Sequence, residues 1–251
     1  MNKIQKAAQV LLQNREQDGL FNGFADADKP TDWQTSVDIQ KQMIVLSGQE
    51  VAGWKCLLPP AEGKVVVGPI FADTVSEGEV CTLRADNGKA RTEPEIAFIL
   101  GQDIDPEKGE YSDDDVFAAI KECRMALELM EERLAPDLRG DFNYRLADVL
   151  MNQGLYLGPV VDKQTAFELA EVHIEFEQNG QVTQAEGKHP NGKASAPLRW
   201  FFNFAIEQGF TLKAGQAIIT GSFAGIIEQD FAPSTIRYQD VGEYQVSFKQ
   251  K

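Results

Sequence analysis

The chain has 251 residues, of which 43% are hydrophobic and 25% charged, a composition that excludes a disordered or fibrous protein and favours one large folded unit. Its 39 acidic and 24 basic side chains give a formal net charge of −15, which disfavours nucleic acid and anionic membranes as partners. Three cysteines without metal-ligand spacing, no signal-like N-terminus and no apolar run of about 18 residues predict a cytoplasmic protein in a reducing compartment.

The first fifty residues are predicted to be mainly helical. Apolar residues recur at helical spacing over residues 4–16, and a second helix is predicted over residues 31–48, ending at Gly48. Beyond residue 53, short β-branched runs separated by Gly, Pro and Asn predict strands. These runs are KVVVGPIF, EVCTL, EIAFIL, LYLGPVV, VHIEFEQNGQVTQAEG and QAIITGSF, of which the fifth holds an Asn-Gly hairpin turn.

Two further helices are predicted among these strands. SDDDVFAAIKECRMA, residues 112–126, begins with a capping serine and three aspartates, and PLRWFFNFAIEQG ends on Gly209, a typical residue just beyond a helix C-terminus. The order of elements predicts an α+β fold. A helical N-terminal segment, residues 1–50, precedes a β-rich, mainly antiparallel body, residues 51–251, and the two form one structural unit.

Two short motifs do not support a function. GKHPNGKA is close to a phosphate-binding loop, but Ala194 replaces the Ser or Thr that holds Mg²⁺. TGSFAG is close to a nucleophile elbow, but Thr220 stands in place of its first glycine. The two histidines, His173 and His189, are too few and too far apart for a metal pair, and each is interpreted as structural or solvated.

Glu93 and Glu95 stand at the mouth of the apolar run in RTEPEIAFIL. In a strand, side chains two residues apart point to one face, so the two carboxylates project together while the apolar side chains of the run face the opposite layer. Pro94 between them predicts an edge strand or a strand start. Because like charges so close repel, either both carboxylates reach bulk water at a wet edge, or a cation lies between them.

A third carboxylate, Glu128, lies in CRMALELMEERLAPDL. If this segment is a helix, Glu128 belongs with Glu131 and Glu132 to a solvated face. If it is a strand, Glu128 lies among buried residues. Three carboxylates without His or Cys favour a hard cation, Mg²⁺ or Mn²⁺, with open positions for substrate oxygens.

Several segments, in order over most of the chain, resemble the fumarylacetoacetate hydrolase superfamily, and within it the branch of 2-keto-4-pentenoate hydratases and 4-oxalocrotonate decarboxylases. They are PTDWQTSVDIQKQM, VAGWK, EPEIAFIL, MALELMEER, LADVLMNQGLYLGP and PLRWFFNFAIEQGFTLKAGQAIITGSF. The resemblance implies the mixed β-roll of that superfamily's C-terminal domain, with flanking helices, and a homo-oligomer. In the family, an E-x-E pair and a later glutamate hold a divalent metal, and the matching residues are Glu93, Glu95 and Glu128.

The resemblance also assigns roles to other residues. Lys55 in GWK matches the family's active-site lysine, as a proton donor or a substrate-positioning charge, although a lysine that snorkels from a strand end is the simpler alternative. Asp148 is kept from an Asp-Asn pair and is a second catalytic candidate. Thr220, Gly221 and Ser222 match a substrate-facing TGS turn.

The implied activity is metal-assisted acid/base chemistry on a small 2-hydroxydienoate or 2-keto acid of aromatic catabolism, foremost hydration of a 2-keto-4-pentenoate-like substrate. A 4-oxalocrotonate-type decarboxylase or a keto-enol tautomerase of the same superfamily is the alternative, and a catalytically silent binding or partner subunit is a third. Hydrolytic members use a His-Glu dyad ahead of the E-x-E pair, and no histidine precedes His173, so hydrolysis is disfavoured. Lys188 and Lys193 are candidates to meet a second anionic group on the substrate.

Overall fold

A computed structural model describes residues 1–17, 19–25 and 28–251. Its helices are α1 (Lys3–Glu16), α2 (Trp33–Ser47), α3 (Asp113–Ala119), α4 (Phe142–Ala147), α5 (Lys163–Glu168) and α6 (Ala196–Glu207). Its strands are β1 (Val51–Ala61), β2 (Lys64–Phe71), β3 (Val75–Glu77), β4 (Val80–Leu83), β5 (Ala90–Leu100), β6 (Ile120–Met130), β7 (Asn152–Val161), β8 (Glu171–Gln178), β9 (Gln181–Lys188), β10 (Ala217–Ile219), β11 (Ile227–Gln229), β12 (Pro233–Tyr238) and β13 (Gly242–Gln250). Short 3₁₀ turns are η2 (Ala72–Thr74), η3 (Pro106–Lys108) and η4 (Val149–Met151).

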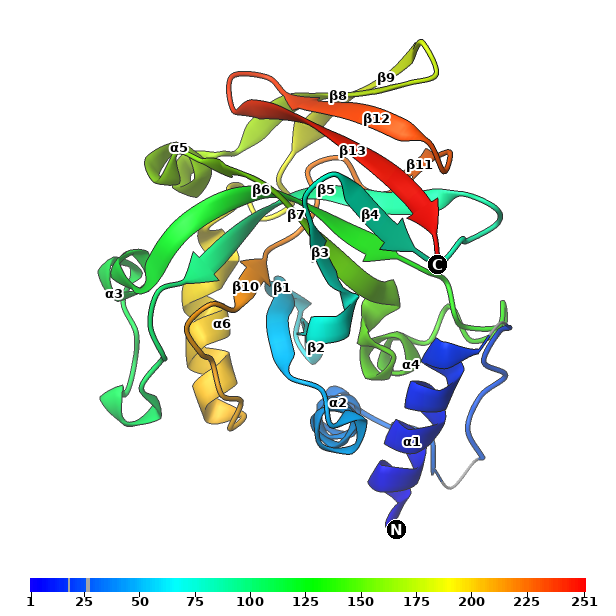
Figure 1. Cartoon of the computed structure of the whole chain (residues 1–251). Helices are drawn as coiled ribbons and strands as arrows, with labels where there is room; N and C mark the ends of the chain where they lie inside the picture. The colour runs from blue at the N-terminus through cyan, green and yellow to red at the C-terminus, as the bar shows by residue number, and fades with distance from the viewer. Residues whose placement is uncertain (18, 26–27) are drawn as a thin grey trace.

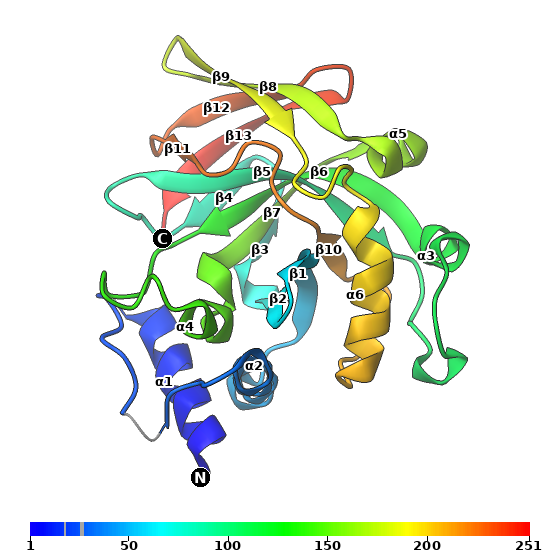
Figure 2. The ribbon, with the colours of Figure 1, turned by 180° about the vertical axis from the view of Figure 1, so that it is seen from behind.

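Two curled sheets form the body of the molecule (Figure 1). The larger sheet has the strand order β2-β1-β10-β5-β6-β7-β3, with β11 also paired to β5, and the smaller has the order β4-β13-β12-β8-β9. Most pairs are antiparallel, while β1 with β10, β3 with β7 and β4 with β13 are parallel. Seen from the front and from behind, α6 lies beside β1 and β10 (Figure 2). The smaller sheet lies at the top of both views, across β5 and β6 from the helices α1 and α2.

The two predicted N-terminal helices are present, and the second ends at Gly48 as predicted. The side chain of Asp32 accepts the backbone N–H of Thr35 at the start of α2, and Gly48 ends that helix in a left-handed conformation with φ 64°. The buried faces of α1 and α2 pack with Phe71 and Tyr144 in one apolar cluster. The helices therefore cover the β2 end of the body. In the described ranges, no helix is both long enough and apolar enough to span a membrane.

The helix predicted over residues 112–126 is half the predicted length. Ser112 caps α3 as predicted, but the helix ends at Ala119 and Ile120 begins β6. The helical prediction for residues 120–126 is wrong because β6 has β5 on one side and β7 on the other, and both ladders bond its backbone. The strand alternative for Glu128 is therefore correct.

Pro94 lies inside the sheet, so the predicted strand edge is also wrong. On the side of β5 away from β6, β11 pairs with residues 90–92 and β10 pairs with residues 97–99. Pro94 falls in the gap between these two short strands, where its missing N–H breaks no ladder bond. Its carbonyl accepts the N–H of Phe223 at 3.1 Å. The gap leaves room beside the two glutamates for the chain that follows β10.

Candidate metal centre

The three predicted carboxylates converge in the structure. The register of β5 and β6 places Glu93 directly opposite Glu128, with Glu95 two residues along the same face. One carboxylate oxygen from each lies within 4.8 Å of the others. Glu95 is 1% exposed and Glu128 2% exposed, while Glu93 is partly exposed. The wet-edge alternative is therefore wrong, because the strand is internal and the carboxylates are largely buried.

The cluster carries more negative charge than the protein neutralises by direct contact. Burial, followed by the charge of Glu128, raises the pKa of Glu93 to about 7. Burial and the charges of Glu128 and Glu93 raise the pKa of Glu95 well above its ordinary value. The ammonium of Lys55 lies 2.6 Å from Glu128 Oε1. When all three carboxylates are ionised, they exceed the ammonium of Lys55 by two negative charges, the charge that a divalent cation would balance.

The donor atoms fit a hard divalent cation. The group consists of glutamate oxygens, which are the ligands that Mg²⁺, Mn²⁺ and Ca²⁺ prefer. The N–H of Gly221 donates to Glu95 Oε2 at 2.7 Å and so orients one of the carboxylates. The three glutamates would hold such an ion through carboxylate oxygens and would leave its other coordination positions to water or substrate.

Lys55 reaches the cluster from β1. Burial alone would lower the pKa of Lys55, but the summed charges of Glu128, Glu93 and Glu95 raise it above its ordinary value, so the ammonium stays protonated at neutral pH. Its Nζ also donates to the carbonyl of Leu150 at 3.3 Å. The snorkelling alternative for Lys55 is wrong, since the side chain is buried and directed at a carboxylate.

Asn152 is a contact residue that the sequence motifs did not identify. Its Nδ2 donates to Glu128 Oε1 at 2.8 Å and to the carbonyl of Gly154. The residue that directly follows Asp148 is Val149, and the asparagine that reaches the cluster lies four residues after Asp148. The sequence signal that could have identified Asn152 is its position as a polar residue at the start of an apolar strand.

A left-handed turn brings these groups to the cluster. Val149, Leu150 and Met151 have φ values of 61°, 54° and 69° in η4. Left-handed backbone costs roughly 1–2 kcal/mol for each such residue, and strain of this kind is concentrated at functional sites. Gly68 makes the turn possible, because a Cβ there would lie 2.4 Å from Val149 Cγ1. The turn carries the Leu150 carbonyl to Lys55 and leads into Asn152.

Asp148 lies in a buried ion pair behind the cluster. Its carboxylate accepts Arg133 Nε at 3.0 Å, and both side chains are 2% exposed. Burial raises the pKa of Asp148, and the charge of Arg133 opposes that rise. Arg133 Nη2 also donates to the carbonyls of Asp148 and Asn152. The catalytic role predicted for Asp148 stays a prediction, and its contacts favour support of Asn152.

The TGS turn reaches the cluster through its backbone. Thr220 follows β10 and is buried, and its Oγ1 has no hydrogen-bond partner in the described part of the chain. Ser222 Oγ donates to the carbonyls of Pro94 and Gly225, which closes the turn onto β5. A Cβ on Gly221 would lie 2.5 Å from Leu57 Cδ2. The wall that faces the turn is therefore apolar.

The loop that follows β9 does not direct a lysine at the cluster. Lys188 pairs with Glu171 and Lys193 with Glu168, each at 3.0 Å on the surface, so the predicted lysine contact with substrate is not supported. His189 is 1% exposed, and its Nδ1 accepts the N–H of Asn191. Burial lowers the pKa of His189 to about 4, so the ring is neutral, in keeping with a structural role.

We expect Gly221→Ala to destabilise the protein by about 1–3 kcal/mol. Its φ of 117° is unfavourable for any residue with a side chain, and the added methyl would meet Leu57. Gly225→Ala is the matched control, since Gly225 also has a positive φ but has open space around a built Cβ. Urea unfolding of both variants is the measurement, and equal losses would show that the turn is not packed as described.

No family model matches the chain, but curated proteins are similar to it. TodF product hydratase of Pseudomonas putida strain F1 is 23% identical over 240 residues, which cover 89% of this chain and 87% of that protein. 2-Keto-4-pentenoate hydratase 1 of Dechloromonas aromatica strain RCB is 22% identical over 240 residues, with 88% of each covered.

Solved structures show the same fold. 4-Oxalocrotonate decarboxylase from Pseudomonas putida G7, complexed with calcium and acetate, superposes with a TM-score of 0.77 at 16% identity over 98% of this chain and 97% of that one. Its complex with magnesium and adipate gives 0.75 over the same shares and at the same identity. A fumarylacetoacetate hydrolase family protein from Yersinia pestis CO92 gives 0.54 at 17% identity over 78% of this chain and 91% of that one. The chain therefore has the fold of these solved structures, and by sequence it is similar to 2-keto-4-pentenoate hydratases, as its motifs predict.

Proposed function

We propose that the protein is a divalent-metal-dependent hydro-lyase that hydrates a 2-keto-4-pentenoate-like acid. The observation that carries the proposal is the convergence of Glu93, Glu95 and Glu128, with two uncompensated negative charges, beside the ammonium of Lys55. The hydratase names of the similar curated proteins support it. Mg²⁺ or Mn²⁺ is the proposed ion, supported by the oxygen ligands and by the calcium and magnesium bound to the decarboxylase of similar fold.

Each residue has a defined part in this proposal. A bound ion would supply Lewis-acid polarisation of the substrate's 2-oxygen. The three glutamates would hold the ion, with Glu95 oriented by the N–H of Gly221. Lys55 is protonated and is the proton donor or the charge that positions the substrate. In hydration, the dienol is protonated at C5 and water then adds to C4, which gives a 4-hydroxy-2-keto acid.

The polar groups around the cluster complete the site. Thr220 Oγ1, buried and without a partner in the described ranges, is left to bind a substrate oxygen. Gly221 and Ser222 hold the turn in place, and Asp148 holds Arg133 and so Asn152. The same proposal includes a homo-oligomer in the cytoplasm, as the family resemblance and the three unpaired cysteines predict.

Decarboxylation of a 4-oxalocrotonate-type acid is the second candidate. It is favoured by the near-complete superposition with 4-oxalocrotonate decarboxylase, and it would use the same residues. Product analysis separates the two, since hydration yields a 4-hydroxy-2-keto acid and decarboxylation releases CO₂. Ketonisation without either product would indicate a tautomerase, and a protein inert on every dienoate tested would indicate a silent partner subunit.

We expect Mg²⁺ and Mn²⁺ to bind the chelator-treated protein, and oxalate, a mimic of the 2-keto acid head, to tighten that binding. The reason is that a chelating dianion fills the positions that three glutamates leave open. Calorimetric titration with and without oxalate is the measurement. Absence of metal binding in both conditions would contradict the proposed centre.

A further inference from the structure

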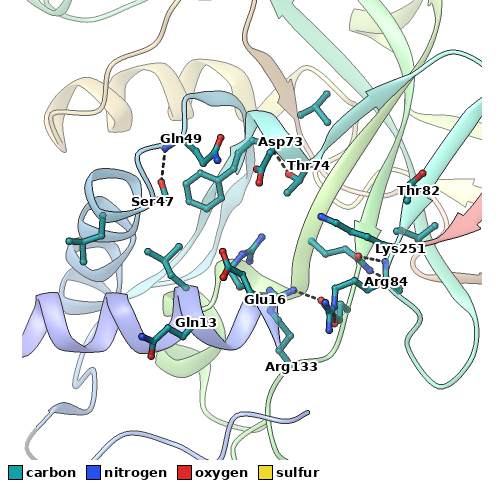
Figure 3. A pocket seen from close by; sticks show the side chains of 18 of the residues that line it. Gln13, Glu16, Ser47, Gln49, Asp73, Thr74, Thr82, Arg84, Arg133 and Lys251 are labelled. Carbon is teal, nitrogen blue, oxygen red and sulfur yellow. Dashed lines mark hydrogen bonds and ion pairs between the residues drawn. The ribbon is translucent and has the colours of Figure 1, made fainter. Parts of the chain in front are cut away.

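A cavity lies apart from the candidate metal centre. It has a volume of about 640 Å³ and opens between α1, the turn from α2 into β1, and the strands β3 and β4. Polar side chains from all these elements gather around it (Figure 3). They include the charged side chains of Glu16, Asp73, Arg84, Arg133 and Lys251. None of the three clustered glutamates lines this cavity, so it is a different site.

Arg15, on the last turn of α1, is the unusual residue of the cavity wall. Its Nη1 donates to the carbonyl of Asn152 at 2.9 Å, and its guanidinium carbon lies 5.7 Å from the centre of the Phe71 ring. In the described residues, no carboxylate lies within ion-pairing distance of it. Arg84 and Arg133, by contrast, pair with carboxylates at 3.0 Å. Arg15 therefore presents unpaired N–H donors to the cavity.

Burial disfavours the positive charge of Arg15. Burial and the nearby charge of Arg133 lower the pKa of Arg15 to about 10, although the charges of Asp148, Glu131 and Asp73 oppose that fall. The guanidinium therefore remains protonated, with these carboxylates near it but none in direct contact. A planar guanidinium with free donors matches the two oxygens of a carboxylate. An anion in the cavity would supply the missing partner.

The rest of the wall limits which anion fits. Apolar side chains contribute much of it, from Leu12, Leu46, Phe71, Val75 and Leu83. The carboxylates of Glu16, Asp73 and Glu131 also line it and would repel a ligand that carries several negative charges. Four cationic side chains also line the cavity, those of Arg15, Arg84, Arg133 and Lys251, but Arg84 and Arg133 are paired with carboxylates. Because the acidic groups limit the negative charge that can enter, the lining and its apolar patches together favour a single negative charge on an apolar body. The volume lies within the usual range for small-molecule sites.

We propose that this cavity is a binding site for a monocarboxylate with an apolar body, whose carboxylate pairs with Arg15. The apolar body packs against Leu12, Leu46 and Phe71. Binding does not require a metal ion, because the site shares no ligand residue with the glutamate cluster.

Benzoate is the probe, titrated by calorimetry into the chelator-treated full-length protein. We expect a Kd of about 1 mM or tighter, in line with a small ligand that makes one charged contact. Arg15→Gln should weaken benzoate binding at least tenfold, and Arg15→Lys should weaken it less. Arg199→Gln is the matched control, since it removes one positive charge from an exposed pair with Glu110 and should leave Kd unchanged. Benzyl alcohol, of the same shape without the charge, should bind at least tenfold more weakly than benzoate.

Arg15→Gln also removes the hydrogen bond from Arg15 to the carbonyl of Asn152, so a second variant that keeps this bond is needed. Leu46 lines the cavity and is 42% exposed, so Leu46→Trp narrows the space without disturbing the core, and should also weaken benzoate binding. Equal affinity of Arg15→Gln and the unmodified protein, no benzoate binding at all, or binding that needs added Mg²⁺ would each overturn the proposal. The last result would assign benzoate to the glutamate cluster. Because the titration contains no metal, failure of the proposed metal centre would leave its outcome intact.

Discussion

Glu95→Gln is expected to weaken Mg²⁺ binding by about 100-fold or more, since losing even an outer partner of a metal ligand costs about 10–100-fold. The amide keeps the shape of the side chain but removes one of three clustered charges. The same change should stabilise the metal-free protein. Folding raises the pKa of Glu95, so the free energy of unfolding falls as the pH rises from the unfolded pKa toward the folded one. Removing the carboxyl removes this loss, and the gain in stability should therefore be larger at pH 8 than at pH 5.

Calorimetry with Mg²⁺ and urea unfolding at both pH values are the measurements for Glu95→Gln. Glu177→Gln is the matched control, because Glu177 is an exposed glutamate on β8 and its loss should change neither quantity. Unchanged Mg²⁺ affinity in Glu95→Gln would show that the ion, if it binds, is held elsewhere. A loss of stability in the metal-free variant would show that Glu95 is structurally favourable in its buried position.

Lys55→Ala is expected to lower turnover of a 2-hydroxydienoate by about 10²–10⁴-fold, the usual contribution of a positioned proton donor. It should also destabilise the metal-free protein by about 3–5 kcal/mol, because Glu128 then loses its partner at 2.6 Å inside the protein. Added Mg²⁺ should restore much of that stability, since the ion neutralises the same carboxylates. Disappearance of the dienoate and urea unfolding with and without Mg²⁺ test these effects.

Lys188→Ala is the matched control for Lys55→Ala. It also breaks a lysine–glutamate pair, but Lys188 and Glu171 are both exposed, and such pairs contribute little. Turnover and stability should stay close to those of the unmodified protein. If Lys55→Ala kept full turnover on every dienoate tested, Lys55 would be a structural counter-ion of Glu128 and would have no catalytic part.

Several features of the protein were determined by local sequence. Gly48 ends α2 and Ser112 begins α3 because capping residues act on their own turn. The Asn179-Gly180 turn closes the β8–β9 hairpin, with both residues at positive φ, because few other residues adopt that backbone. The shared direction of Glu93 and Glu95 followed from the two-residue period of a strand.

Other features were decided only by tertiary structure. Residues 120–126 are compatible with a helix locally, and they form a strand because β5 and β7 bond both of its edges. That pairing, between segments about thirty residues apart, places Glu128 opposite Glu93 and so creates the cluster. Pro94 is tolerated inside the sheet because β10 and β11, which lie far along the chain, leave a gap beside it.

Tertiary structure also decided which group each charged or polar side chain of the site contacts. Lys55 against Glu128, Asn152 against Glu128, and Arg15 against the carbonyl of Asn152 all join residues that are more than twenty positions apart. The sequence by itself determined which residues carry charge and which short segments are helix or strand, because those properties depend on neighbours along the chain. Which charges meet, and which remain unpaired beside a cavity, depended on how the sheets close, because side chains interact across a few ångströms of space whatever their separation in sequence.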